Sequence, residues 1–207
     1  PRTTFFPYTT LFRSTDGDSW VEITDMEAYI NHIHTVRYDS TDGELYIGTG
    51  DTGTGPSIIV WDMVSAWPVL PKPIDVIATS GFRGFAEDEK YRVIDFVFTD
   101  DWVYIASYNT AGAACGIYRF PRDCSSYNKL EDIPASIKHA GWSGFIYNGM
   151  IFFCDQYDTG TEAYYNIWAS DDGENFEIIE RAWIDAGATG GVLPKGMLQT
   201  DDGYMYF

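Results

Sequence analysis

Ser170-Asp171-Asp172-Gly173-Glu174-Asn175-Phe176 has the form Ser-x-Asp-Gly-x-x-aromatic, and the same form occurs at Ser14-Thr15-Asp16-Gly17-Asp18-Ser19-Trp20. The two copies are three steps of about 52 residues apart. Aspartate followed by glycine is typical of a tight turn, because the carboxylate can hydrogen-bond to nearby backbone N–H groups and glycine tolerates left-handed backbone angles. The spacing therefore predicts a repeated unit of about 50 residues.

The composition favours strands over helices. The chain has 207 residues, of which 45% are hydrophobic and 17% aromatic, and it contains 20 glycines. Aromatic residues favour strands, while glycines favour tight turns. We therefore expect an all-β protein with a buried core. No apolar run approaches the roughly 18 residues that cross a bilayer, so no membrane span is expected.

The charge and the cysteines exclude further classes of protein. A formal net charge of −18 would repel a phosphate backbone, so we expect no nucleic-acid partner; solubility is the simpler role of this charge. The three cysteines, Cys115, Cys124 and Cys154, are an odd number and do not indicate a disulfide framework. The sequence does not decide whether these cysteines are oxidised or reduced.

A β-hairpin pattern recurs four times. An apolar strand turns into a strand of alternating aromatic and aliphatic residues at 35–38 to 45–47, 94–98 to 103–105, 144–146 to 151–153, and 197–199 to 205–207. The second strands begin at Leu45, Val103, Ile151 and Met205, again about 50 residues apart. A third strand follows each of the first three hairpins and carries Trp61, Tyr118 and Trp168.

A fourth, outer strand is expected at 20–23, 128–133 and 176–180, and in the first full repeat it is obscured by Pro68, Pro71 and Pro73. Four strands in about 50 residues are typical of one blade of a β-propeller. We therefore predict a propeller fragment with about three complete four-stranded blades at 30–80, 90–134 and 138–183, and partial blades at both ends, the last at 195–207.

With its two boxes and its third-strand aromatics, the chain resembles the Asp-box (BNR-repeat) β-propellers of the sialidase-like superfamily. The resemblance implies that the box forms the turn between the third and fourth strands and that its aromatic residue packs between blades. It assigns this structural role to Asp16, Gly17, Trp20, Ser170, Asp172, Gly173 and Phe176. The two middle copies, at 61–67 and 122–127, keep an acid and an aromatic residue but lose the glycine. The full protein is expected to have six or seven blades and to be monomeric when complete.

Residues 4–14 resemble the in-frame translation of a widely used sequencing adapter, a likeness of nucleotides and not of a protein family. On this interpretation residues 1–14 are an artefactual leader and the partial propeller occupies 15–207. We then expect the natural sequence to begin inside a gene and the last strand to be cut short. An extracellular or cell-surface location is favoured.

The first strand of each blade begins at the end of the sheet where propellers usually bind ligands. The candidate catalytic residues at this end are His32, His34, Arg92 and His139. His32 and His34 are two apart on an expected strand, so they share a face and could hold a metal ion or divide acid and base roles; ordinary structural contacts are the alternative. Arg92, next to Lys90, suits an anionic group such as a carboxylate, unless both only offset the acids at 87–89.

The loops between the second and third strands, at 48–56, 107–114 and 155–166, open at the same end. They supply the candidate ligand-binding residues Asp51, Tyr108, Asn109, Asp155 and Tyr157. Such acids, amides and aromatic rings can hydrogen-bond to and stack on sugars, and they also occur at protein interfaces. No cofactor is predicted, although a metal ion at His32 and His34 stays open.

Two functions follow from these patterns. The first is a glycan-directed propeller that binds or processes carbohydrate or a cell-surface glycan, with an activity like that of a glycoside hydrolase or polysaccharide lyase if it is an enzyme. Sialidase activity is not inferred, because the arginine triad that the resemblance would require cannot be assembled from matched motifs. The alternative is a non-enzymatic protein-interaction or adhesion propeller in which the boxes are structural.

Overall fold

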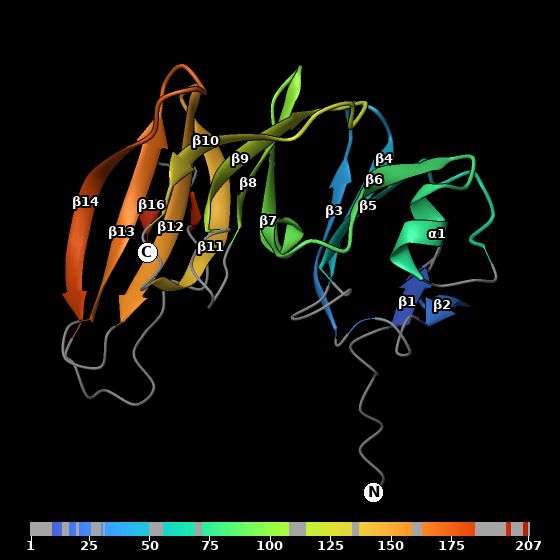
Figure 1. Cartoon of the computed structure of the whole chain (residues 1–207). Helices are drawn as coiled ribbons and strands as arrows, with labels where there is room; N and C mark the ends of the chain where they lie inside the picture. Colours follow the sequence, from blue (N-terminus) through green and yellow to red (C-terminus); the bar gives the residue numbers. More distant parts are fainter. Residues whose placement is uncertain are drawn as a thin grey trace, which may run out of the picture. The chain divides into compact units, whose positions relative to one another are not determined.

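A computed structural model gives the fold of the chain (Figure 1) and describes residues 10–13, 17–19, 21–25, 30, 32–49, 56–68, 72–107, 115–133, 137–158, 163–184, 198–199 and 205–206. The all-β prediction is confirmed, since strands make up nearly all of the regular structure. The chain divides into two compact units, Pro1–Arg92 and Val93–Phe207. Within the described part of the chain, neither helix has the length and apolar character needed to cross a membrane.

The first unit contains one four-stranded antiparallel sheet and one two-stranded sheet. The four-stranded sheet has the order β3 (Ile33–Asp39), β4 (Glu44–Thr49), β5 (Ser57–Trp61), β6 (Phe82–Ala86). The two-stranded sheet pairs β1 (Thr10–Arg13) with β2 (Val21–Asp25). β1 lies within the segment that resembles a translated adapter, and its Leu11 packs into the same apolar cluster as Ile47 and Ile59.

The second unit contains two four-stranded antiparallel sheets and one short hairpin. One sheet comprises β7 (Val93–Phe98), β8 (Trp102–Ser107), β9 (Gly116–Pro121) and β10 (Asn128–Asp132). The next comprises β11 (Ile137–Tyr147), β12 (Met150–Asp158), β13 (Ala163–Ser170) and β14 (Glu177–Ile184). The hairpin pairs β15 (Leu198–Gln199) with β16 (Met205–Tyr206).

The four expected hairpins are present. Each residue that begins a second strand in the repeat faces the first strand, in the pairs Leu45–Tyr38, Val103–Phe98, Ile151–Ile146 and Met205–Gln199. The third-strand aromatic residues do not all pair at the same position of the second strand. Trp61 faces the first residue, Leu45, whereas Tyr118 and Trp168 face the residues two positions after the corresponding first residues. All three therefore keep the same side of their sheets.

The fourth strand of the first sheet was expected near the prolines, within residues 30–80, and this prediction was wrong. It is β6, which ends at Ala86 and so beyond the predicted unit of 30–80. Between β5 and β6 lies the helix α1 (Pro73–Ile77), which packs on both strands (Figure 1). Pro73 stands in its first turn, where a missing N–H costs nothing, and Val76 is fully buried. Pro73 therefore marks a helix start and not an edge strand.

The box turn at Asp172 connects β13 to β14. Its Oδ1 atom accepts hydrogen bonds from the backbone N–H groups of Glu174 and Asn175, both at 2.8 Å. These bonds, with that of the Asn175 side chain, hold the pKa of Asp172 well below its ordinary value. Gly173 adopts a left-handed φ of 69°. The turn thus has the geometry that the box predicts.

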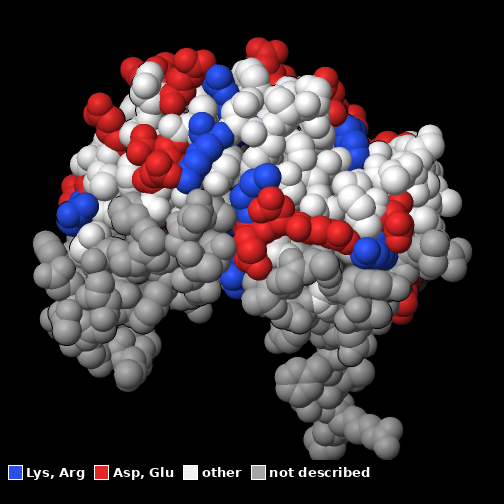
Figure 2. All heavy atoms as spheres, viewed as in Figure 1, with Lys and Arg blue, Asp and Glu red and all other residues white. Residues whose placement is uncertain are grey.

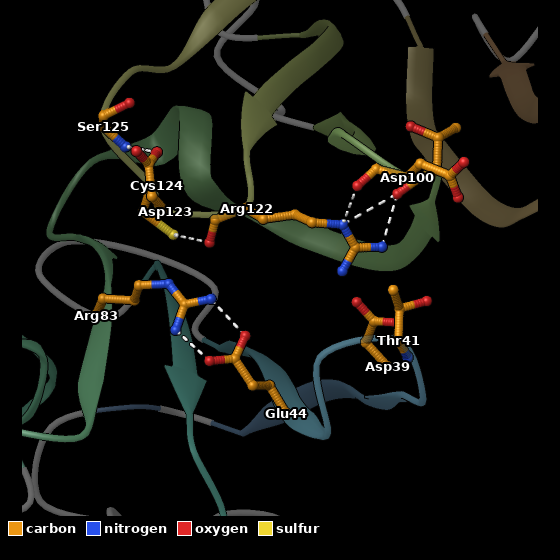
Figure 3. Close-up of polar contacts among 10 residues, drawn as sticks. Asp39, Thr41, Glu44, Arg83, Asp100, Arg122, Asp123, Cys124 and Ser125 are labelled. Atoms are coloured by element: carbon orange, nitrogen blue, oxygen red, sulfur yellow. Dashed lines mark hydrogen bonds and ion pairs between the residues drawn. The ribbon is translucent and has the colours of Figure 1, made fainter.

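The two copies without glycine make the same kind of turn. Asp62 accepts hydrogen bonds from the backbone N–H groups of Val64 and Ser65, and these bonds, that of Ser65 foremost, lower its pKa. Asp123 accepts one from Ser125 N at 2.9 Å (Figure 3). The residues after these aspartates, Met63 and Cys124, have left-handed φ values of 61° and 56°, as Gly17 does at 83°. The aspartate therefore specifies this turn even where glycine is absent.

We expect Cys124→Gly to stabilise the protein by about 0.5–1 kcal/mol relative to Cys124→Ala. A left-handed residue with a Cβ atom costs about 1–2 kcal/mol, and the greater freedom of glycine in the unfolded chain offsets part of this. Both variants remove the thiol, so chemical denaturation of the pair isolates the backbone effect. A Cys124→Gly variant no more stable than Cys124→Ala would show that the turn carries no such strain.

Candidate functional site

The candidate site lies at the end of the first four-stranded sheet where β3 begins. The antiparallel order places the starts of β3 and β5 beside the ends of β4 and β6. His32 and His34 therefore share this end with Ser57, Ala86 and the segment that follows β6. The Asp62 turn lies at the opposite end, because it follows β5.

His32 and His34 form a close pair. Their ring centroids are 4.5 Å apart and the rings are tilted by 48°. The register of β3 against β4 shifts between Ile33 and Thr35, so His34 is the extra residue of a bulge. Two adjacent half-buried imidazoles can exchange a proton or supply two metal ligands. No group of three or more metal-binding side chains occurs among the described residues.

Bulges recur on the first strands of the other two sheets. The register of β7 against β8 shifts between Val93 and Phe96, and that of β11 against β12 shifts between Ile137 and His139. The first register shift of each strand lies near the strand start, and β11 has a second one between Ala140 and Gly144. Bulges re-aim side chains and are enriched beside active sites. The sequence did not reveal them, since a bulge adds a residue without a characteristic motif.

The segment after β6 brings charged groups to the same end. Glu87 has a left-handed φ of 64°, and its Oε1 atom lies 3.0 Å from Lys72 Nζ. Asp88 and Lys90 form an ion pair at 2.9 Å. Burial raises the pKa of Asp88, but hydrogen bonds from Lys90 outweigh it, and the pKa of Lys90 is raised mainly by its bond to Asp88. Lys90 therefore neutralises the charge of Asp88, in agreement with the alternative that the basic residues here offset the acids at 87–89.

Arg92 is buried and directly follows the 3₁₀ helix η1 (Glu89–Tyr91). Tyr91 stacks on Phe85 with ring centroids 5.2 Å apart. This end of the first sheet thus carries two imidazoles, a buried guanidinium and an aromatic pair. On the face drawn in Figure 2, the basic side chains of the described residues lie among acidic ones.

Several predicted site residues lie outside the described residues: Asp16, Trp20, Asp51, Tyr108 and Asn109. The backbone of His139 faces Gln156 in the β11–β12 pair. Tyr157 faces Tyr164 within the β12–β13 pair and so stands in a strand, not in the expected loop. The loop position was wrong because β12 continues to Asp158.

Asp155 was also expected in that loop, but it lies inside β12 and is only 2% exposed. Its Oδ2 atom accepts a hydrogen bond from Trp168 Nε1, and its Oδ1 atom accepts one from Asn166 Nδ2 at 2.7 Å. Arg181 Nε donates to Asn166 Oδ1 at 2.8 Å and extends the network. Desolvation raises the pKa of Asp155 to about 6, although these hydrogen bonds lower it. The hydrogen-bonding capacity of Asp155 is therefore used inside the sheet.

A second buried carboxylate was missed by the sequence. Asp95 Oδ2 accepts a hydrogen bond from Gly144 N at 3.1 Å and so joins β7 to β11. A Cβ atom at Gly144 would come within 2.5 Å of Val97 Cγ2, so the close approach of the two strands requires glycine here. The alternating pattern of β7 could have indicated an inward acid at position 95, but not its partner on another sheet.

Comparison with known proteins gives no match, neither with a family model nor with a curated protein.

Asp155 makes the stability depend on pH in a definite direction. The folded chain holds this proton more tightly than the unfolded chain, so the contribution of Asp155 is greatest below pH about 4 and falls as the pH rises to about 6. Asp155→Asn is neutral throughout. The free energy of unfolding of the wild type, relative to this variant, should fall by up to about 3 kcal/mol across that window. A difference that does not change with pH would contradict the raised pKa.

Proposed function

We propose that the chain is part of an Asp-box β-propeller that binds glycans at the end of the sheets where the first strands begin. Support for the ring arrangement comes from the second unit. There the first strands β7 and β11 are joined through Asp95 and Gly144. The box residue Phe176 lies between Tyr104 of one sheet and Phe153 of the next. Its ring centroid is 6.4 Å from that of Tyr104 and 6.1 Å from that of Phe153. Neighbouring sheets that pack face to face, with their first strands close together, are arranged as adjacent blades are.

The observation that carries the glycan proposal is the contact between His32 and His34 at a bulge. Imidazoles donate and accept hydrogen bonds, and sugar hydroxyls need partners of both kinds. The stacked Phe85 and Tyr91 at the same end supply aromatic surface of the kind that packs against a pyranose ring. We favour binding over turnover, because Lys90 is already paired with Asp88 and Asp155 is used inside its sheet.

An adhesion or protein-interaction propeller is the second candidate. It is favoured by exposed apolar side chains on two first strands: Val36 and Tyr38 on β3, and Ile146 on β11. Tyr38 and Ile146 hold the same place in the repeat, because each faces the residue that begins the second strand. A protein partner would cover such side chains more fully than a hydrated glycan would.

The test is a glycan array followed by calorimetry, with neutral and uronate-containing polysaccharides and an assay for cleavage products. We expect binding without products. The double variant His32→Ala, His34→Ala should weaken binding by about tenfold or more, since each lost hydrogen bond contributes about 1 kcal/mol. Thr35→Ala, which changes the residue directly after His34, is the matched control and should bind as the wild type does.

Three results would contradict this proposal. Binding unchanged in the double variant would place the site elsewhere, and no binding to any glycan would favour the adhesion alternative. Cleavage that requires His32 and Arg92 would instead make the chain an enzyme.

A further inference from the structure

Arg181 is an exposed residue on the outer strand β14 of the second unit. Its Cζ atom lies 4.4 Å from the centroid of the Tyr164 ring, and its Nε atom donates to Asn166 Oδ1 at 2.8 Å. Neither partner is an anion, so the guanidinium keeps its net charge. Its two terminal nitrogens, Nη1 and Nη2, make no hydrogen bond or ion pair with the residues that the structure describes. Tyr164 is the second residue of β13, so the stack lies toward the end of the sheet where β11 begins.

Other basic side chains of the described residues have an acidic partner, as Lys72, Arg83, Lys90, Arg119 and Lys129 do. The chain offers acids in excess, with 31 acidic and 13 basic residues. Glu177 and Glu180 even stand on the same strand as Arg181. Arg181 is instead held by a neutral amide and an aromatic ring. Neutralisation of a nearby acid therefore does not explain its position.

A row of polar side chains across the sheet orients the guanidinium from behind. Asp155, Asn166 and Arg181 face one another on the neighbouring strands β12, β13 and β14. Asp155 and Asn166 are each only 2% exposed. Asp155 Oδ1 accepts a hydrogen bond from Asn166 Nδ2 at 2.7 Å, so the amide turns its oxygen toward Arg181. Trp168 Nε1 donates to the other carboxylate oxygen and holds it in place. Arg181 is thus positioned by a buried supporting network, as the residues of binding sites are.

Arg119, on β9, shows what a guanidinium held in this way binds. Its Cζ atom lies 4.2 Å from the centroid of the Trp102 ring, so it is stacked as Arg181 is. Its Nη2 atom donates to Glu174 Oε1 at 2.8 Å, and its Nη1 atom donates to the Gly173 carbonyl oxygen at 3.2 Å. A stacked arginine therefore still binds an oxyanion through its terminal nitrogens, here a carboxylate of the chain itself. Arg181 has the same stacking without such a carboxylate among the described residues.

We propose that Arg181 binds an oxyanion of a ligand through Nη1 and Nη2, while Tyr164 and Asn166 hold the guanidinium in position. A carboxylate, sulfate or phosphate group offers two acceptor oxygens that match the two terminal nitrogens. The net charge of −18 repels polyanions, so the ligand carries one such group or a few. The site lies in the second unit and does not use the histidine pair of the proposed glycan site, so either proposal can fail without the other.

The test is an NMR titration in which sodium acetate, sulfate or phosphate replaces sodium chloride at constant ionic strength. The Nε–H signal of Arg181 and the side-chain amide signals of Asn166 are followed. We expect a saturable shift with at least one anion, because new hydrogen bonds at Nη1 and Nη2 polarise the whole guanidinium. The anion that binds most tightly identifies the group on the ligand: acetate represents a carboxylate, and sulfate or phosphate represents an ester. Arg119 is the internal control, and its signal should not shift, since Glu174 occupies its terminal nitrogen.

Three variants separate a positioned guanidinium from a mere positive charge. Arg181→Lys keeps the charge but loses the planar pair of donors, and it should raise the dissociation constant by about tenfold. Tyr164→Leu removes the ring under the guanidinium and should raise the dissociation constant by about twofold to fivefold. Tyr164→Phe keeps the ring, is the matched control and should bind as the wild type does. The backbone amide spectrum of each variant checks that it is folded.

Shifts that do not saturate with any of the three anions would overturn the proposal. The same affinity in Arg181→Lys as in the wild type, or an equal shift at Arg119, would also overturn it, because any exposed positive charge would then account for the effect. If Tyr164→Leu bound as tightly as Tyr164→Phe, the positioning role of the ring would be refuted.

Discussion

The structure depends on one interaction: an aspartate carboxylate at the end of a third strand that accepts backbone N–H groups of the following turn. The Asp172 carboxylate holds the backbone N–H groups of Glu174 and Asn175 in the turn, and β14 begins directly after it. Phe176 is thereby carried into the core shared by two sheets. Because Gly173 has no Cβ atom, the Tyr104 hydroxyl can lie close to the turn, and Arg119 donates to the Gly173 carbonyl oxygen. A local hydrogen bond thus determines how neighbouring sheets pack.

The two ends of each four-stranded sheet differ in the role of their side chains. The Asp turns occupy the end where third strands finish, and they use their carboxylates internally. The opposite end holds the bulged starts of the first strands, with His32 and His34 in contact. A chain whose turns are fixed by backbone hydrogen bonds can vary the other end without losing its sheets. Recognition is therefore proposed at that end.

The sequence predicted the strands well where the signal was local. Alternating residues and the turns at the hairpins located β3, β4, β7, β8, β11 and β12, and the third-strand aromatics located β5, β9 and β13. It failed where a residue's role depends on tertiary contacts. Pro73 begins a helix and β6 starts nine residues after it, while Asp155 was expected in a loop but is buried against Trp168. Of the site, His32 and His34 were named as a pair from their spacing on an expected strand, but their contact lies at a bulge. The bulges and the Asp95–Gly144 link could not be predicted, because both depend on a partner strand.

The most direct measurement of the central claim is thermal unfolding of Asp172→Ala beside Asp171→Ala. The two residues are adjacent, exposed and equally charged, but only Asp172 accepts the turn's backbone N–H groups. The account predicts that Asp172→Ala lowers the Tm clearly, with loss of the near-ultraviolet signal of the packed aromatic rings on milder heating, while Asp171→Ala stays close to the wild type. Equal Tm values for the two variants would contradict it.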